Sequence, residues 1–370
     1  MRGAYLLATP VQRIDGSYHL LKDALKKNDI KTVYLDMYYK QYRSIPKERT
    51  DVQMDYIYCI TDYMPMSVNK ASFLLEASGA DRYIENFLPA ARYGNYLLDY
   101  ERMERIIKAK RTEEYRNYGV MPTMWNSEYA FCQGSPRLYG YIEEGELEPV
   151  GDMIMSDYSL RHLDKMVKLC KDNDIELVLL VTPVSNFWLE AMGDYDKYYE
   201  FLKDYAEEAD VEYYDFNLVR DEVFHQVPEY YIDTHHLSGQ GALDYTKLLC
   251  DMMRNIPKED RDELFYASIE EKLQAVEPQV FGIAMKPVSA ETQTESSGGS
   301  GMYSICAASN YDVTLEWRLV RLDEEGNEIE LITDFSTDVT CSKDLLEGNK
   351  IRIYGRDVAT GDILIMVDTN

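Results

Sequence analysis

Short apolar runs alternate with stretches of helical spacing over residues 1–257. Runs rich in apolar residues at 31–39, 176–182 and 211–216 predict strands; the first is typical of a buried strand, and the second is strongly apolar. Apolar residues spaced three and four apart predict helices over 18–27, 156–170, 194–209 and 239–253. This succession of strands and helices predicts an α/β fold with a doubly wound parallel sheet.

Other segments of this region are less regular. The runs 4–8 and 56–60 are shorter strand candidates, and 67–118 is predicted to be mostly helical. Residues 119–152 contain turn residues without periodicity, so we interpret them as an irregular segment that covers a site. Ser17 stands directly before the first predicted helix, where an N-cap residue belongs.

The hydrophobic pattern changes after Pro257. A connecting helix is predicted over 263–276, and the Gly- and Ser-rich segment 289–301 is typical of a linker. Further on, apolar and polar residues alternate, which predicts a small antiparallel, immunoglobulin-like β-sandwich. The predicted domains are an α/β domain over 1–257, a connecting helix and linker over 258–301, and the β-sandwich over 302–370.

The charge of the chain excludes some classes of partner. It has 39 Lys and Arg residues against 66 Asp and Glu residues, which gives a formal net charge of −27. Such an acidic surface repels nucleic acid and anionic lipid, and no basic cluster offers a local exception. No apolar run is long enough to cross a membrane and no export signal follows Met1, so we expect no direct membrane span.

The six cysteines are widely spaced and form no CxxC pair. This spacing favours small buried hydrophobic side chains over a zinc site or a disulfide framework. They are Cys59, Cys132, Cys170, Cys250, Cys306 and Cys341. The last two lie in the predicted sandwich, and the sequence leaves open whether they pair. We expect no cofactor.

The stretch 230–249, YYIDTHHLSGQGALDYTKLL, carries the candidate chemistry. It places Asp233 and His236 on a short loop that leads into a helix. A histidine can take the proton of a serine while a carboxylate holds the imidazole in the required tautomer. Sites of open α/β sheets lie at the carboxyl ends of strands, where this loop falls. The alternative is structural, with Asp233 capping a local turn and His236 packing against the start of the helix.

The Asp-x-x-His-Leu block, with Gly241 opening a helix, resembles the last block of the SGNH (GDSL-like) hydrolases. The segments KTVYLDMYY, ELVLLVTPVSNFW and VEYYDFN extend the resemblance to a DltD-like, envelope-associated branch over residues 1–255. The resemblance implies a flavodoxin-like sheet and acyl-ester hydrolysis or transfer on cell-envelope carbohydrate. It assigns His236 as the general base and Asp233 as the carboxylate that orients it.

The nucleophile of that family is a serine in a Gly-Asp-Ser or Gly-Ser-Ser block, and no such block precedes the first matching strand. We expect it upstream of Met1, together with a membrane anchor; otherwise the run 4–8 moves inward or another chain supplies a strand. The DGS tripeptide has related residue types in another order, so Ser17 is a candidate nucleophile besides its capping role. Ser185 and Asn186 follow a strand and are candidates for lining a cleft, or turn residues.

His235 stands beside His236, and clusters of histidine and carboxylate can bind a metal ion. Because neighbouring residues seldom face one ion, we expect no metal site here and a role in the turn for His235. The remaining histidines are isolated in the sequence: His19, His162 and His225.

Two functions follow from these observations. The leading hypothesis is an SGNH-type esterase or acyltransferase for acylated carbohydrate or a small ester, weak or inactive without its serine block. It would lie in the extracytoplasmic envelope if an upstream anchor exists, and otherwise in the cytoplasm. The alternative is a non-catalytic glycan-binding or scaffold protein with a degenerate hydrolase cleft, because 32 tyrosines suit sugar-facing surfaces.

Overall fold

The structure is a computed structural model of the chain. The described residues are 5–9, 12–39, 42, 54, 57, 58, 60–62, 64–78, 86, 104, 107, 108, 139–141, 155–192, 195–233, 235–288 and 302–369. Most of the predicted irregular segment 119–152, the linker 289–301 and two cysteines, Cys59 and Cys132, lie outside them.

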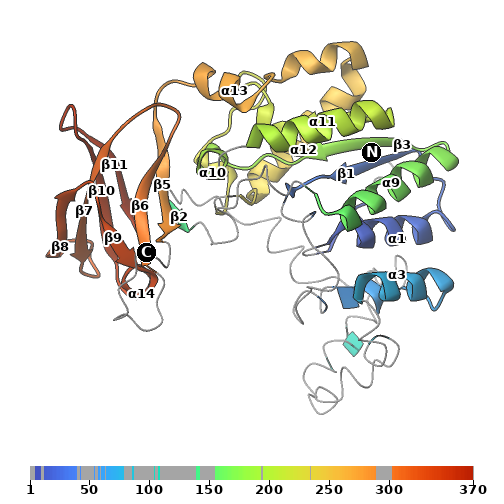
Figure 1. Ribbon diagram of the computed structural model, residues 1–370, viewed down its shortest axis with the longest axis horizontal. Helices are drawn as coiled ribbons and strands as arrows, with labels where there is room; N and C mark the ends of the chain where they lie inside the picture. Colours follow the sequence, from blue (N-terminus) through green and yellow to red (C-terminus); the bar gives the residue numbers. More distant parts are fainter. Residues whose placement is uncertain are drawn as a thin grey trace. The chain divides into compact units, whose positions relative to one another are not determined.

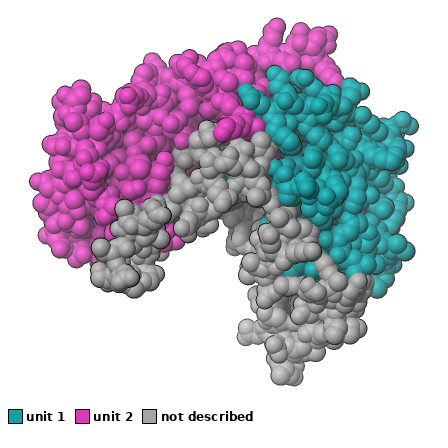
Figure 2. Space-filling model, in the orientation of Figure 1, with its two compact units in different colours: residues 1–128, 153–181, 200–214 teal, residues 129–152, 182–199, 215–370 magenta. Residues whose placement is uncertain are grey.

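The chain divides into two compact units, which Figure 2 shows in different colours. Unit 1 consists of Met1–Glu128, Met153–Val181 and Glu200–Tyr214, and unit 2 of Tyr129–Asp152, Thr182–Tyr199 and Asp215–Asn370. The chain passes between the units several times, and each unit is described by itself below.

The three strongest apolar runs form a three-stranded sheet in the order β1-β3-β4. Strand β1 is Thr32–Asp36, β3 is Glu176–Val181 and β4 is Glu212–Asp215. β1 and β3 pair in parallel, and all of β3 after its first residue is buried. The prediction of an α/β fold with a parallel sheet is therefore confirmed in kind, and the strongly apolar strand β3 is the central one.

The helices predicted around these strands are confirmed, with ends that shift by a few residues. Helix α1 packs against α3 and α9 in unit 1 (Figure 1). Ser156 caps α9, since its side chain accepts a hydrogen bond from the backbone amide of Ser159. The helices are α1 Ile14–Ala24, α3 Val68–Ser78, α9 Asp157–Asp172, α10 Asn186–Met192, α11 Tyr195–Ala209 and α12 Gly239–Asn255.

The predicted capping role of Ser17 is wrong. Helix α1 begins at Ile14 with Arg13 as its N-cap, and the backbone amide of Ser17 donates to the Arg13 carbonyl at 3.0 Å inside the helix. Gly16 permits close packing against a neighbouring segment. A Cβ at this position would lie 3.1 Å from Cδ1 of Ile60. The Asp-Gly-Ser tripeptide therefore lies inside helix α1, where its glycine leaves room for the side chain of Ile60.

Two short strand predictions are also wrong. The described positions of the run 56–60 are helical, and they join a buried cluster with Phe73 and Leu74 of α3. The described part of the run 4–8 is not a strand, and Leu6 is 80% exposed. A run of five apolar residues does not distinguish a strand from a turn of helix, and only the packing partner decides between them.

The C-terminal part of unit 2 contains two four-stranded sheets (Figure 1). Their orders are β2-β5-β6-β9 and β11-β10-β7-β8. Among the described residues, neighbouring strands of these sheets pair antiparallel except β2 with β5, which pair in parallel. The elements are β2 Tyr139–Tyr141, β5 Val280–Pro287, β6 Met302–Ser309, β7 Leu315–Leu322, β8 Glu328–Ser336, β9 Thr340–Ser342, α14 Lys343–Glu347, β10 Ile351–Asp357 and β11 Ile363–Asp368.

Both sheets contribute to one hydrophobic cluster. Ile283 and Ile305 come from one sheet, and Trp317 and Ile353 come from the other. Antiparallel sheets with one buried and one exposed face produce the alternating pattern from which these strands were predicted. The sequence did not reveal β5, which lies in the segment predicted as a connector.

The predicted connecting helix 263–276 starts later than expected. A 3-10 helix spans Lys258–Leu264, and helix α13 spans Ile269–Ala275. Ser268 separates them, because its side chain accepts a hydrogen bond from the backbone amide of Glu271 and so begins α13.

The cysteines in the described residues are free thiols. Cys306 and Cys341 do not pair, although they lie on neighbouring strands of one sheet. Burial raises the pKa of the Cys341 thiol to about 11. Among the described residues, no helix combines the length and apolar character that a membrane crossing requires.

Candidate functional site

The loop before α12 is a tight bend closed by backbone hydrogen bonds. The amide of Ile232 donates to the carbonyl of His236 at 2.9 Å, and Tyr231 and Leu237 form an antiparallel bridge. The amide of Ser238 donates to the carbonyl of Tyr230 at 2.7 Å. These bonds fix the chain on both sides of Asp233 and His236, which therefore lie on a short bend with a defined shape.

The start of helix α12 is bonded to, and packs against, the chain segment that enters the bend. The buried Ser238 hydroxyl accepts from the backbone amide of Gly241 and donates to the carbonyl of Glu229. A Cβ on Gly241 would lie 2.3 Å from the carbonyl oxygen of Tyr230. Glycine is therefore required at position 241 because the first turn of α12 touches the backbone of the bend.

Asp233 and His236 form a hydrogen-bonded pair on this bend. Oδ2 of Asp233 and Nδ1 of His236 are 2.7 Å apart. Oδ1 of Asp233 accepts the backbone amides of His235 at 2.9 Å and of His236 at 2.8 Å. A carboxylate accepts only, so Nδ1 of His236 carries a proton and the neutral ring has its lone pair on Nε2.

The electrostatics of the pair keep the carboxylate ionised. Burial alone would raise the pKa of Asp233, but the hydrogen bonds from the His236 ring and the His235 amide outweigh it, and the pKa lies well below its ordinary value. The side chains of His236 and Asp233 are 52% and 36% exposed. The predicted pair is thus assembled at a surface position that a substrate can reach.

His235 lies against the pair and against Trp188. Its ring centroid is 5.0 Å from that of Trp188 and 4.2 Å from that of His236. One ligand atom from each of Asp233, His235 and His236 lies within 4.8 Å of the others. The three side chains are therefore close enough to share one metal ion, an alternative that the sequence did not favour.

A buried polar network joins the bend to the loops that follow β3 and β4. The Tyr231 hydroxyl donates to the carbonyl of Val184, and the amide of Val184 donates to the side chain of Asn217. The Tyr195 hydroxyl donates to Asp215 at 2.7 Å and accepts from the Asn217 side chain at 2.8 Å. Sequence reasoning noted Asp215 and Asn217 only as part of a motif, because their partners lie on other segments.

Lys272 enters the same network from α13. It is 2% exposed, and its ammonium group donates to the carbonyl of Asn217 at 2.7 Å. Burial lowers the pKa of Lys272 to about 8, while the charges of Asp215 and Asp221 partly oppose this shift. Nothing in the sequence distinguishes this lysine from any other charged residue of a short helix.

The other residues proposed from the sequence have structural contacts of their own. The Ser17 hydroxyl accepts from the side chain of Gln12 at 2.9 Å, and this serine belongs to unit 1, whereas the Asp233–His236 pair belongs to unit 2. The Ser185 hydroxyl accepts from the amide of Trp188 and Asn186 is the first residue of α10, so both lie at a helix start that follows β3.

The structure also brings together three residues that the sequence left unconnected. His19 of α1, Glu76 of α3 and His162 of α9 lie in unit 1 with one ligand atom from each within 4.8 Å of the others. The only signal in the sequence is that His162 precedes Leu163 on the apolar face of a predicted helix, where a histidine is buried.

Comparisons with protein families, curated proteins and solved structures found no match to this chain.

Proposed function

We propose that this protein hydrolyses or transfers acyl esters, with His236 as the general base and Asp233 as the carboxylate that orients it. The observation that carries this proposal is the 2.7 Å bond between the two side chains, in which the carboxylate is also held by two backbone amides. An ionised carboxylate fixed in this way sets the tautomer of the imidazole and stabilises the imidazolium ion that forms when the ring takes a proton.

The proposal includes the finer fold assignment. The parallel sheet and its helices would be a flavodoxin-like, SGNH-type domain, and the two C-terminal sheets an immunoglobulin-like β-sandwich. In a sheet of that kind the site lies at the carboxyl ends of the strands. The network from Tyr231 through Val184 to Asn217 supports this reading, because it ties the bend to the segments directly after β3 and β4.

The reaction needs a nucleophile whose proton His236 accepts. Ser17, the serine proposed from the sequence, lies inside α1 of unit 1 with its hydroxyl bonded to Gln12, so it stays a candidate and labelling has to identify the nucleophile. The nucleophile attacks the ester carbonyl, the acyl–oxygen bond breaks, and His236 returns the proton to the leaving alcohol. Water or an acceptor hydroxyl then takes the acyl group by the same route.

Charge restricts the substrate class. With a net charge of −27 the chain repels polyanions, so neutral acylated carbohydrates and small esters are the fitting substrates. A neutral acetyl ester with a chromogenic leaving group is therefore a suitable first substrate.

The test compares the pair with a matched control on the same unit. His225 and Asp221 form an exposed hydrogen-bonded pair with the same 2.7 Å distance on the turn that follows Arg220, away in sequence from the bend before α12. We expect Asp233→Asn and His236→Ala to lower kcat/KM by about 10⁴-fold, as loss of a tautomer-setting carboxylate does in serine hydrolases. His225→Ala should keep the wild-type value.

Labelling with a fluorophosphonate probe identifies the nucleophile. A covalent adduct that maps to Ser17 and is lost in Ser17→Ala would assign the reacting oxygen, and an adduct on another serine would replace Ser17 in the mechanism. Equal turnover in wild type and His236→Ala would refute the proposal. Binding of an acylated glycan without turnover or labelling would favour the non-catalytic function instead.

A further inference from the structure

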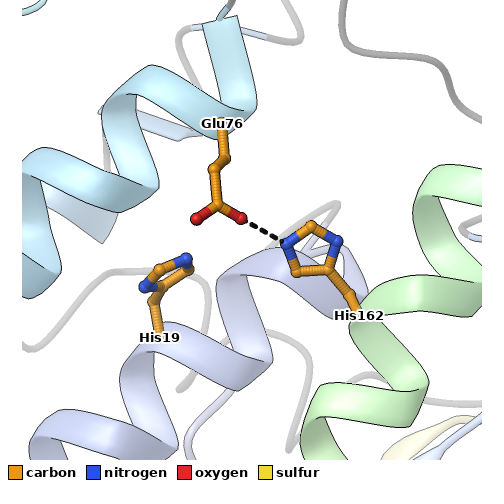
Figure 3. A group of neighbouring side chains, drawn as sticks. All are labelled: His19, Glu76 and His162. Atoms are coloured by element: carbon orange, nitrogen blue, oxygen red, sulfur yellow. Dashed lines mark hydrogen bonds and ion pairs between the residues drawn. The ribbon is translucent and has the colours of Figure 1, made fainter.

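Three helices of unit 1 direct one group of side chains to a common point. Figure 3 shows the rings of His19 and His162 and the carboxylate of Glu76 pointing toward one another from α1, α9 and α3. The side chain of His162 is 2% exposed and that of Glu76 is 31% exposed. His19 is 1% exposed, so the group is closed on the side of the rings and open beside Glu76.

The protonation of His19 follows from its neighbour Asn69. The Asn69 side-chain nitrogen donates to the carbonyl of His19 at 2.9 Å, which leaves its oxygen facing Nδ1 of the same histidine at 2.8 Å. Because that oxygen only accepts, Nδ1 carries the proton and Nε2 carries the lone pair. Nε2 of His19 is buried and has no hydrogen-bond partner, which is costly for a polar atom inside a protein.

His162 is oriented in the same way. Its Nδ1 lies 2.9 Å from the carbonyl of Tyr158, which only accepts. Its Nε2 differs from that of His19 because it has partners: it lies 2.9 Å from Oε2 of Glu76 and 3.5 Å from the ammonium nitrogen of Lys165, two contacts that a bound ion would replace. Each ring therefore has a backbone or amide oxygen fixing Nδ1–H, which is the usual arrangement around metal-bound histidines and sets Nε2 as the ligand atom.

The Glu76 carboxylate is held by a lysine and a serine. Its Oε2 accepts a hydrogen bond from the ammonium group of Lys165, and its Oε1 accepts one from the Ser72 hydroxyl at 2.7 Å. The ammonium group of Lys165 lies 2.8 Å from Oε2 and is 42% exposed, so it can leave toward solvent. The carboxylate is thus available for a stronger cation placed between the two rings.

We propose that His19, His162 and Glu76 bind a divalent transition-metal ion of the zinc class. The ligand atoms are Nε2 of both histidines and a carboxylate oxygen of Glu76, and the ion would satisfy the buried lone pair of His19. Two histidines and one glutamate form a three-ligand set that zinc accepts with a water in the fourth position. The ion would connect α1, α3 and α9.

This inference stands apart from the proposed esterase chemistry, because the two groups of residues share no side chain. The acidic chain would still attract cations in general, so the test must locate the ion. Full-length protein stripped with a chelator is titrated with zinc and, separately, with cobalt. We expect one ion per chain, a visible absorption band typical of low-coordinate cobalt, and a rise in Tm with zinc concentration, because a ligand that binds only the folded state stabilises it.

The variants separate metal binding from folding. His19→Gln and Glu76→Gln keep the size of each side chain and should abolish the cobalt band. Asn69→Ala removes only the oxygen that orients His19, and we expect a loss of about 10- to 100-fold in zinc affinity. Lys165→Met removes the competing ammonium group, so it should bind zinc more tightly than wild type while the chain stays folded.

The controls address the second histidine group. The double variant His235→Ala, His236→Ala removes the group on the bend and should leave the cobalt band and the zinc affinity of wild type unchanged. Loss of the ion in that variant, with retention in His19→Gln, would move the site to the bend and overturn the proposal. Absence of zinc binding in both wild type and Lys165→Met would show that the three side chains form only a hydrogen-bonded cluster, and would overturn it as well.

Discussion

The two histidine–carboxylate groups of this protein are built in opposite ways. Asp233 and His236 lie three positions apart on an exposed bend, and the backbone itself supplies the other bonds to the carboxylate. His162 and Glu76 lie 86 positions apart and meet between helices, where the ring is nearly inaccessible. The first group is formed by residues that are close in sequence and lies at the surface. The second group forms only when the helices pack against one another.

This difference predicts unequal costs of removal. A group that holds packed helices together contributes to the free energy of unfolding, whereas an exposed pair contributes little because water solvates both partners. The exposed pair can therefore serve a chemical role with little effect on the free energy of unfolding. The buried group is tied to stability, and to any ion that it binds.

The largest effect expected on stability separates the two groups directly. His162→Ala leaves the Glu76 carboxylate without one partner and opens a cavity, so we expect the free energy of unfolding to fall by about 3 kcal/mol. His236→Ala should change it by less than about 1 kcal/mol. Urea denaturation of both variants, with chelator present throughout, measures the difference. Equal losses would contradict the distinction drawn between the groups.

Within unit 2, the exposed Asp233–His236 pair contrasts with Lys272, whose ammonium group is buried. The pKa of Lys272 is lowered from 10.5 in the unfolded chain to about 8 in the folded protein. Between these values the unfolded chain binds more protons, so the free energy of unfolding increases as the pH rises from 8 to 10.5. The increase amounts to about 3 kcal/mol.

Lys272→Met isolates this contribution, because tyrosines that titrate in the same range are common to both proteins. Denaturation at a series of pH values should show that wild type gains stability relative to Lys272→Met over that interval. A constant difference between the two proteins would mean that the lysine is solvated in the folded state. The exposed Lys247 gives a matched control as Lys247→Met, with no comparable change expected.

The smallest effect concerns the rigidity of the bend. Gly241→Ala places a methyl group against the carbonyl of Tyr230, so the first turn of α12 must move, at a cost of about 1–3 kcal/mol. NMR shifts of the His236 ring should change with it, since Ser238 and Tyr230 connect the helix to the bend. Gly326→Ala serves for comparison, because that glycine has a φ of 88° but no atom near its missing Cβ, and its effect stays at the β7–β8 turn. Wild-type stability and ring shifts in Gly241→Ala would show that the close approach is relaxed in solution.

The elements that the sequence predicted well share a simple property. Strand β3 is strongly apolar after its first residue, and α9 and α12 combine a capping serine with an apolar face. A short apolar run by itself was not sufficient. The run 56–60 became helical, and β5 was not recognised in a segment without clear alternation.

The sequence by itself predicted the contact between Asp233 and His236, because residues three apart on one short bend lie near each other. It could not determine the site of His19, Glu76 and His162, nor the burial of Lys272 on the Asn217 carbonyl. These contacts depend on how separate helices and loops pack, and the spacing of residues along the chain carries no record of that packing. Contacts between residues that are close in sequence depend mainly on the local backbone, whereas contacts between distant segments form only when the whole unit has folded.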